Sequence, residues 1–148
     1  MLTDLPFDPA QVLIDGTWHS TSHTLAVSDP STGDPLTHIA RGTKAEIDAA
    51  VAAAQRARDG AWGRMPAHER GRILARLGAL VTDQVDALAR IEALDVGKPL
   101  AQARADAVAL ARYCEFYAGA ADKIMGQTIP YLDGYTVYAI REPNGVTG

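Results

Sequence analysis

The sequence predicts an α/β chain in which small antiparallel strands come first, several long helices follow, and a β-hairpin comes last. Three observations carry this prediction. Short extended segments separated by turn residues occupy residues 11–40. Apolar residues then recur at helical spacings over residues 43–123. Over residues 127–140, apolar and aromatic residues alternate on either side of Asp133-Gly134, which is typical of two strands and a tight turn.

The bulk composition is that of an ordinary globular domain. The 148 residues suit one domain by length, and 47% hydrophobic with 22% charged residues exclude a disordered chain. A net charge of −4 offers no basic face for nucleic acid, and charges interrupt the long apolar runs, so we expect no membrane span. The N-terminus has no basic start, which argues against a secretion signal. A lone cysteine fits a reducing compartment, and we expect the cytoplasm.

The opening segment is expected to form a small antiparallel unit. The run Val12–Ile14 is followed by Asp15-Gly16, a strong hairpin turn signal, and Thr24–Val27 is the second extended segment. Two prolines and a glycine over residues 29–35 predict a firm turn. A further strand is expected at Leu36–Ala40 because its residues alternate.

Two amphipathic helices are expected next. Thr43 and Glu46 have the spacing of a capping box, and this helix should end near Gly60 with its apolar face at Ile47, Ala50, Val51, Ala54 and Ala57. Trp62, in the connection that follows, is read as a hydrophobic plug rather than a ligand-stacking platform. The next helix opens at Pro66 and carries a stripe of Leu, Ile and Val. Gly71 and Gly78 inside it indicate close packing against a neighbour, and a break is expected at Thr82-Asp83.

A helical corner is expected at Gly97-Lys98-Pro99. Gly97 can adopt the left-handed conformation that ends a helix, and Pro99 suits the start of the next one. The second helix should span Leu100–Lys123. Its face of small residues would let another backbone approach closely: Ala103, Ala107, Leu110, Ala111, Cys114, Ala118 and Ala121. In the hairpin that follows, Pro130 is typical of an edge strand. An open strand edge is prone to aggregation, so we expect another surface to pair with it.

The chain resembles the N-terminal region of the NAD(P)-dependent aldehyde dehydrogenases. The resemblance rests on three motifs in order, together with matching upstream segments: Glu92–Pro99, Phe116–Lys123 and Arg141–Val146, then Ile14–Trp18, Asp29–Gly33 and Ala61-Trp62. It implies the N-terminal part of that fold, ending before the nucleotide-binding sheet. Residues 1–126 would be the helical and strand part of the cofactor-binding domain, 127–142 an oligomerisation hairpin, and 143–148 the start of the sheet's first strand.

The resemblance also implies a function. The family oxidises an aldehyde to a carboxylic acid through a cysteine thiohemiacetal, with NAD or NADP as cofactor. By this resemblance the chain supplies scaffold and assembly surface, carries no catalytic or cofactor-binding residue, and is inactive without the remaining part of the enzyme, on the same chain or a separate one. The expected partners are that remaining part, further copies through the 127–142 hairpin, and a small aldehyde. A non-catalytic assembly or regulatory module derived from the family is the alternative.

The residues that could carry chemistry are expected to have structural roles. Cys114, in mid-helix beside Glu115, has nothing nearby to favour its thiolate and is expected to be a buried apolar residue. The four histidines show no metal-binding spacing, and no G-x-G-x-x-G run is present. Lys98 is expected to act at the helix corner or an interface rather than on a cofactor.

Two sites are implied by the resemblance. Asp95, with the main-chain carbonyls of Val27 and Ser28, would bind a structural monovalent cation, Na⁺ or K⁺, since a carboxylate and carbonyls suit a hard cation. A local turn or interface role for Asp95 is the alternative. The helix that starts at Leu100 would form a wall of the substrate tunnel, with Asp106 and Leu110 facing it. Tyr113 or Cys114 would follow further along this wall.

Overall fold

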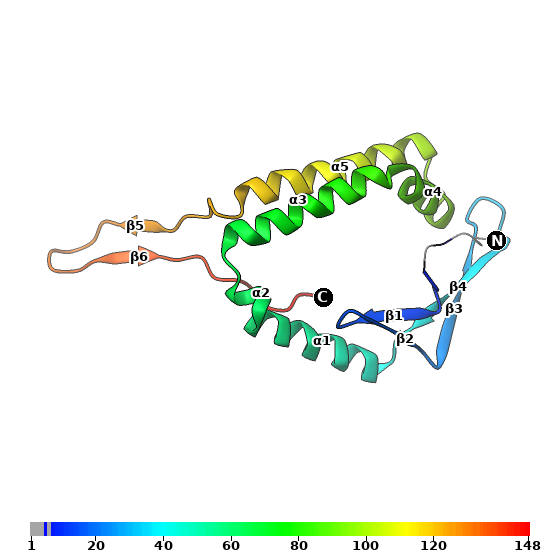
Figure 1. Ribbon diagram of the computed structural model, residues 1–148, viewed down its shortest axis with the longest axis horizontal. Helices are drawn as coiled ribbons and strands as arrows, with labels where there is room; N and C mark the ends of the chain where they lie inside the picture. Colours follow the sequence, from blue (N-terminus) through cyan, green and yellow to red (C-terminus); the bar gives the residue numbers. More distant parts are fainter. Residues whose placement is uncertain (1–4, 6) are drawn as a thin grey trace.

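The computed structural model describes residues 5 and 7–148 and confirms the predicted α/β architecture of small antiparallel strands, long helices and a final hairpin (Figure 1). The elements in chain order are β1 (Gln11–Ile14), β2 (Thr17–Ser20), β3 (His23–Ser28), β4 (Pro35–Arg41), α1 (Lys44–Asp59), α2 (Ala61–Arg64), α3 (Ala67–Asp83), α4 (Val85–Val96), α5 (Leu100–Ala120), β5 (Gln127–Ile129) and β6 (Val137–Ala139).

The opening strands form two separate two-stranded antiparallel sheets. Asp15 and Gly16 both have positive φ, 53° and 74°, as a two-residue hairpin turn of the I′ type requires, and they join β1 to β2. The predicted partner of the first strand is therefore wrong: Thr17–Ser20 pairs with it, whereas Thr24–Val27 lies in β3 and pairs with β4. All four residues of β2 are exposed, so they lack the alternation that marks a half-buried strand.

The capping box at the start of α1 is confirmed. The Thr43 hydroxyl accepts from the Ala45 amide at 3.3 Å, and the Thr43 amide donates to the Glu46 carboxylate at 2.6 Å. The predicted buried face of this helix is rotated, however. Ala53 is its buried residue, whereas Ile47 is 59% exposed. Ile47 and Val51, which is 43% exposed, are thus only partly covered by the described part of the chain.

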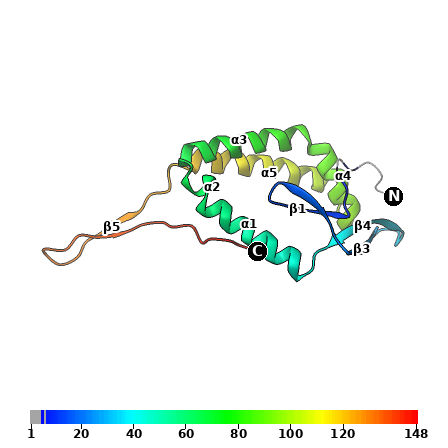
Figure 2. The same ribbon diagram turned by 60° about the horizontal axis from the view of Figure 1, so that its bottom comes forward.

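Helices α3 and α5 lie side by side in both views (Figures 1 and 2), joined through residues that have almost no side chain. A Cβ on Gly71 would lie 2.6 Å from the carbonyl oxygen of Ala118, and one on Gly78 would lie 3.1 Å from the Cβ of Cys114. Close packing therefore accounts for both glycines. Cys114 is buried here, as expected. The predicted break is also present, since α3 ends at Asp83 and α4 begins at Val85.

The final hairpin extends away from the helices in both views (Figures 1 and 2). Gln127 pairs with Ala139 and Ile129 with Val137, and the strand ends before Pro130, which has no amide hydrogen to give to a ladder. Tyr131 and Tyr135 make an edge-to-face contact beside the turn, with ring centroids 5.8 Å apart.

The core of the described residues consists mainly of small side chains. Its buried apolar residues are Leu36, Ala53, Val81, Val85, Ala89, Ala103, Ala107, Ala111 and Cys114. Most large apolar side chains stay exposed, above all on α3, α5 and the hairpin. Within the described residues, none of the helices combines the length and the apolar character needed to cross a bilayer.

Candidate functional site

The corner between α4 and α5 is held in place by its backbone. Gly97 has φ 69°, in the left-handed region, and its amide donates to the Ala93 carbonyl at 3.1 Å to close α4. The carbonyl of Pro99 then accepts from the amides of Gln102 and Ala103 at the start of α5. The link between the two helices is therefore short, and Lys98 lies in the middle of it.

Lys98 joins the two helices on either side of the corner. Its ammonium donates to the carboxylate of Glu92 in α4 and, at 2.6 Å, to that of Asp106 in α5. Gln102 donates to the second oxygen of Asp106 at 3.0 Å. The Lys98 side chain is 28% exposed and that of Asp106 41% exposed, so the bridge is partly sheltered from water. Lys98 thus has the corner role that the sequence predicts.

The hydrogen bonds of this bridge shift the pKa of Lys98 and that of Asp106. Hydrogen bonds first to Asp106 and then to Glu92 raise the pKa of Lys98 above its ordinary value. The hydrogen bond from Lys98, and secondarily that from Gln102, lowers the pKa of Asp106. Both groups therefore stay ionised near neutral pH, and neither is poised to exchange a proton in a reaction.

The same corner lies against the turn between β3 and β4. A Cβ on Gly97 would lie 2.9 Å from Cγ of Pro30, so the backbone of Gly97 lies close against the Pro30 ring. This turn is tightly bonded: Asp29 donates to the Asp34 carbonyl at 2.8 Å and accepts from the Gly33 amide at 2.7 Å, main chain to main chain. The elements that carry the predicted cation ligands are thus neighbours.

The three predicted ligands lie in those neighbouring elements. Asp95 is exposed in the last turn of α4, and Val27 and Ser28 end β3, where a bulge interrupts the ladder. Within residues 5 and 7–148, no group of three or more His, Cys, Asp or Glu side chains could hold a metal ion. A cation here would depend on the single carboxylate and on main-chain carbonyls. Whether an ion binds stays a prediction.

The predicted tunnel residues lie on α5 in different surroundings. Asp106 is engaged by Lys98, whereas Leu110 is 47% exposed. Of the two residues expected further along, Tyr113 is exposed, and Cys114 turns to Gly78 of α3. Leu110 and Tyr113 therefore leave apolar surface open on α5, and Asp106, one turn before Leu110, is paired with Lys98.

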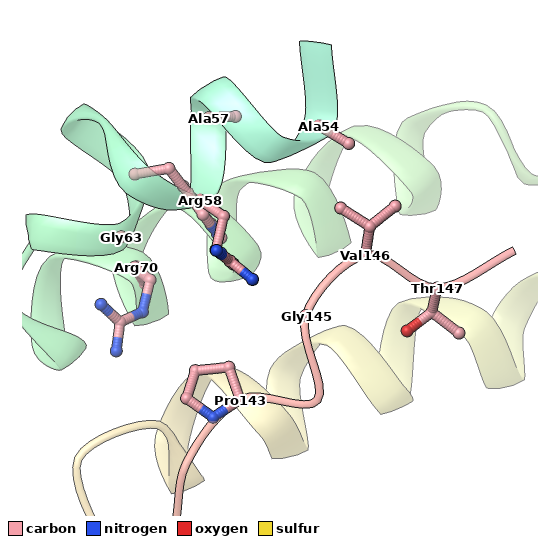
Figure 3. A pocket seen from close by; sticks show the side chains of 10 residues that line it. Ala54, Ala57, Arg58, Gly63, Arg70, Pro143, Gly145, Val146 and Thr147 are labelled. Carbon is pink, nitrogen blue, oxygen red and sulfur yellow. The ribbon is translucent and has the colours of Figure 1, made fainter. Parts of the chain in front are cut away.

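A cavity of about 540 Å³ lies between α1, α2 and the C-terminal segment, and the sequence did not predict it (Figure 3). Val146 points toward Ala54 of α1, and the guanidinium of Arg58 reaches Gly145. The Arg58 side chain is bonded to Asp59 at 2.8 Å, and Arg70 donates to the Met65 carbonyl. Trp62 and Thr147 also line the wall, and the described lining residues include no His, Cys, Asp or Glu that could act as a base beside the Thr147 hydroxyl.

Comparison with known proteins decides the family. The Aldehyde dehydrogenase family model matches residues 18–148. The chain belongs to this family. It is 42% identical over 142 residues to the mitochondrial aldehyde dehydrogenase family 2 member B4 of Arabidopsis thaliana, with 93% of this chain and 26% of that protein covered. The family and fold that the sequence predicts are therefore confirmed.

Solved aldehyde dehydrogenases have the same fold over this region. A putative aldehyde dehydrogenase from Burkholderia cenocepacia matches with a TM-score of 0.83 and 59% identity, over 88% of this chain and 28% of that one. Betaine aldehyde dehydrogenase from Staphylococcus aureus, solved with NAD⁺, matches with a TM-score of 0.76 and 31% identity, over 83% of this chain and 25% of that one. The chain thus spans about a quarter of the length of these relatives.

Proposed function

We propose that this chain is part of an NAD(P)-dependent aldehyde dehydrogenase that oxidises an aldehyde to a carboxylic acid through a cysteine thiohemiacetal. The observation that carries the proposal is the family match over residues 18–148, joined to the fold shared with NAD⁺-bound relatives. The nucleophile, the base and the dinucleotide site would lie in the remaining part of the enzyme. The chain would supply scaffold, assembly surface and one wall of the substrate passage.

We assign no residue of this chain to the dinucleotide. The sequence has no G-x-G-x-x-G run, and the two arginines of the cavity in Figure 3 are already bonded to Asp59 and to the Met65 carbonyl. Neither of these two features supports a pyrophosphate site in this cavity. The cofactor, NAD or NADP, would bind to the remaining part of the enzyme.

Complementation tests this function. The chain is mixed with a polypeptide that carries the rest of a family member, and formation of reduced nicotinamide is followed with NAD and NADP over a series of aldehydes. We expect aldehyde-dependent reduction in the mixture and none with either part alone. Tight binding without turnover would instead support a non-catalytic assembly or regulatory module.

Asp95, Val27 and Ser28 are proposed to bind Na⁺ or K⁺. The contact between Gly97 and Pro30 supports this, because it brings the end of α4 to the turn that follows Ser28. Replacing Na⁺ or K⁺ by a bulky organic cation at equal ionic strength should then lower the free energy of unfolding. The loss would be about 1.4 kcal/mol if the ion had been present at about ten times its Kd. Asp95→Asn should abolish the difference, whereas the control Asp133→Asn should keep it.

The open face of α5 near Leu110 is proposed as the tunnel wall, with Asp106 beside it. An acid there disfavours anionic aldehydes, although the bond to Lys98 offsets part of its charge. In the assembled enzyme, Asp106→Ala should improve kcat/KM for aldehydes that carry a carboxylate relative to neutral ones. An unchanged ranking would contradict a role for Asp106 in the tunnel.

The hairpin of residues 127–142 is proposed as the surface through which copies assemble, because it stands clear of the helices with exposed aromatic side chains. We propose the cytoplasm as the location, since a single cysteine suits a reducing compartment. The Arabidopsis relative is a mitochondrial protein by name, and fractionation of the source cells would decide between the two compartments.

A further inference from the structure

The only asparagine of the chain is followed directly by a glycine. Asn144 and Gly145 lie after β6, where residues 140–148 form neither helix nor strand. Asn144 is exposed and Gly145 is half-buried, so water reaches the side-chain amide of the asparagine. The pair thus lies in an irregular and accessible stretch of backbone.

The backbone amide of Gly145 is not held in place. Within residues 5 and 7–148 it donates to no backbone carbonyl, whereas the amide of Gly97 is bonded to Ala93. Its φ of 98° is one that glycine adopts without strain. A Cβ on Gly145 would meet the Arg58 guanidinium at 3.4 Å, and that group ends a long side chain that can turn aside. The peptide group between Asn144 and Gly145 is therefore weakly restrained.

An amide nitrogen in this position can attack the side chain that precedes it. The Gly145 nitrogen loses its proton to solvent and bonds to Cγ of Asn144, which closes a five-membered succinimide ring. The bond from Cγ to Nδ2 breaks, and Nδ2 takes up a proton from solvent and leaves as ammonia. Water then opens the ring at either carbonyl and gives aspartate or isoaspartate. Water is the only co-reactant, and glycine has no side chain to hinder this reaction of a thermolabile residue.

We propose that Asn144 is a site of spontaneous deamidation in the folded chain. The product makes the net charge one unit more negative than −4. The new carboxylate arises next to Gly145, which the Arg58 guanidinium reaches, so an acid appears beside a cation of the cavity in Figure 3. Isoaspartate also adds one carbon to the backbone path, close to where Val146 points toward Ala54. The modification thus alters the charge and the shape of this wall, and it does not depend on the proposed function.

The test incubates the full chain at mildly alkaline pH and follows its tryptic peptide 142–148, which contains Asn144 and none of the five glutamines. This peptide should gain about one dalton as NH₂ is replaced by OH, and about three in ¹⁸O-labelled water. The rate should rise in proportion to hydroxide, because the Gly145 amide must lose a proton. A segment that no ordered element holds opens at almost no cost, so the folded chain should react within about threefold of a free peptide of residues 139–148.

Two variants serve as controls. Asn144→Gln would need a larger ring and should react at least about tenfold more slowly, a rise of about 1.4 kcal/mol in the barrier. Asn144→Asp carries the charge of the product from the start, and the acidic band that the wild type develops on native isoelectric focusing should migrate with it. Slow amide hydrogen exchange in α3 and α5 shows that the samples stay folded.

Two results would overturn the proposal. A folded chain that reacts more than about tenfold more slowly than the free peptide would show that the fold holds Asn144 and Gly145, with a cost of about 1.4 kcal/mol or more for opening. Equal rates for the wild type and Asn144→Gln would exclude ring closure by the Gly145 amide.

Discussion

Two glycines of α3 face α5 closely: a Cβ would lie 2.6 Å from the nearest atom of α5 at Gly71, which leaves it no room, and 3.1 Å from it at Gly78. The oxygen that a Gly71 Cβ would meet belongs to the Ala118 carbonyl, and backbone cannot rotate aside as the end of a long side chain can. The cost of glycine in a helix, about 1 kcal/mol relative to Ala, is therefore tolerated here for the sake of contact. Gly119 on α5 has no atom within 4 Å of its would-be Cβ and serves no such purpose.

Gly71→Ala is expected to destabilise the chain by about 1–3 kcal/mol, because separating the helices costs more than the gain in helix propensity. Gly119→Ala, the matched control, should instead stabilise by up to about 1 kcal/mol. Urea unfolding of both variants gives the free energies. If both substitutions stabilised the chain, the close approach of α3 and α5 would be wrong.

The capping box of α1 predicts a pH dependence. Hydrogen bonds from the Thr43 side chain, and then from its backbone, lower the pKa of Glu46 below its ordinary value of 4.5. A lowered folded pKa means that the stabilisation is complete above 4.5 and is lost as the pH falls through the folded pKa. The cap therefore weakens only in acid.

Thr43→Ala should cost about 1 kcal/mol at neutral pH, and the difference from wild type should shrink as the pH drops below 4.5. Glu46→Gln keeps an acceptor but no longer titrates, so its stability should lack this acid-dependent part. Thermal unfolding across the acid range measures both. A difference for Thr43→Ala that does not change with pH would separate the cap from the ionisation of Glu46.

At the scale of elements, the corner after α4 combines two requirements in one glycine. Gly97 has a left-handed backbone and also lies against Pro30 of the β3–β4 turn. Gly33, in that turn, has a similar φ of 79° but open space around it. Substitutions at Gly33 and Gly97 therefore separate two costs of adding a side chain: that of holding it on a left-handed backbone, and that of displacing a neighbouring element.

Gly33→Ala should lose about 1–2 kcal/mol, the cost of a left-handed backbone for an L-residue. Gly97→Ala should lose roughly 1–3 kcal/mol more, since its Cβ would also push Pro30 away. Chemical denaturation of the two variants gives the comparison. Equal losses would show that the corner does not press on the turn.

Elements that are set by residues close together in the sequence could be predicted. Those that depend on packing against residues far away in the sequence could not. The capping box at Thr43, the turn at Asp15-Gly16 and the stop at Gly97 each have a physical cause within a few residues. Strand β2 has none, since its four residues are exposed and are held only by pairing with β1. The rotation of α1 has the same origin: Ala53 is buried and Ile47 is not.

At the candidate site, too, local features could be predicted and contacts between distant residues could not. The role of Lys98 at the corner was predicted from its place between Gly97 and Pro99. Its two carboxylate partners were not, because Glu92 and Asp106 meet it only once both helices have formed. The cavity beside Arg58 was missed because Pro143–Thr147 folds back against α1, a contact that no spacing in the sequence indicates.

At the scale of the whole molecule, the described chain buries small residues and exposes large ones. Its core is dominated by alanines, which remove little apolar area from water, whereas the exposed set includes most of its aromatic and Leu, Ile and Val side chains. Exposed apolar surface of this extent marks regions that another surface covers. The hairpin is the clearest case, because a lone pair of strands is marginal in water.

Self-association should therefore depend on the hairpin. Tyr135→Ser with Tyr138→Ser removes two exposed rings, and the Kd of association should rise at least about tenfold, since aromatic side chains carry much of the energy of an interface. Tyr113→Ser, which removes an equally exposed ring from α5, is the control and should leave Kd unchanged. Sedimentation velocity over a dilution series measures all three. If the control weakened association as much, the copies would meet through α5, and the hairpin would have to be covered by something else.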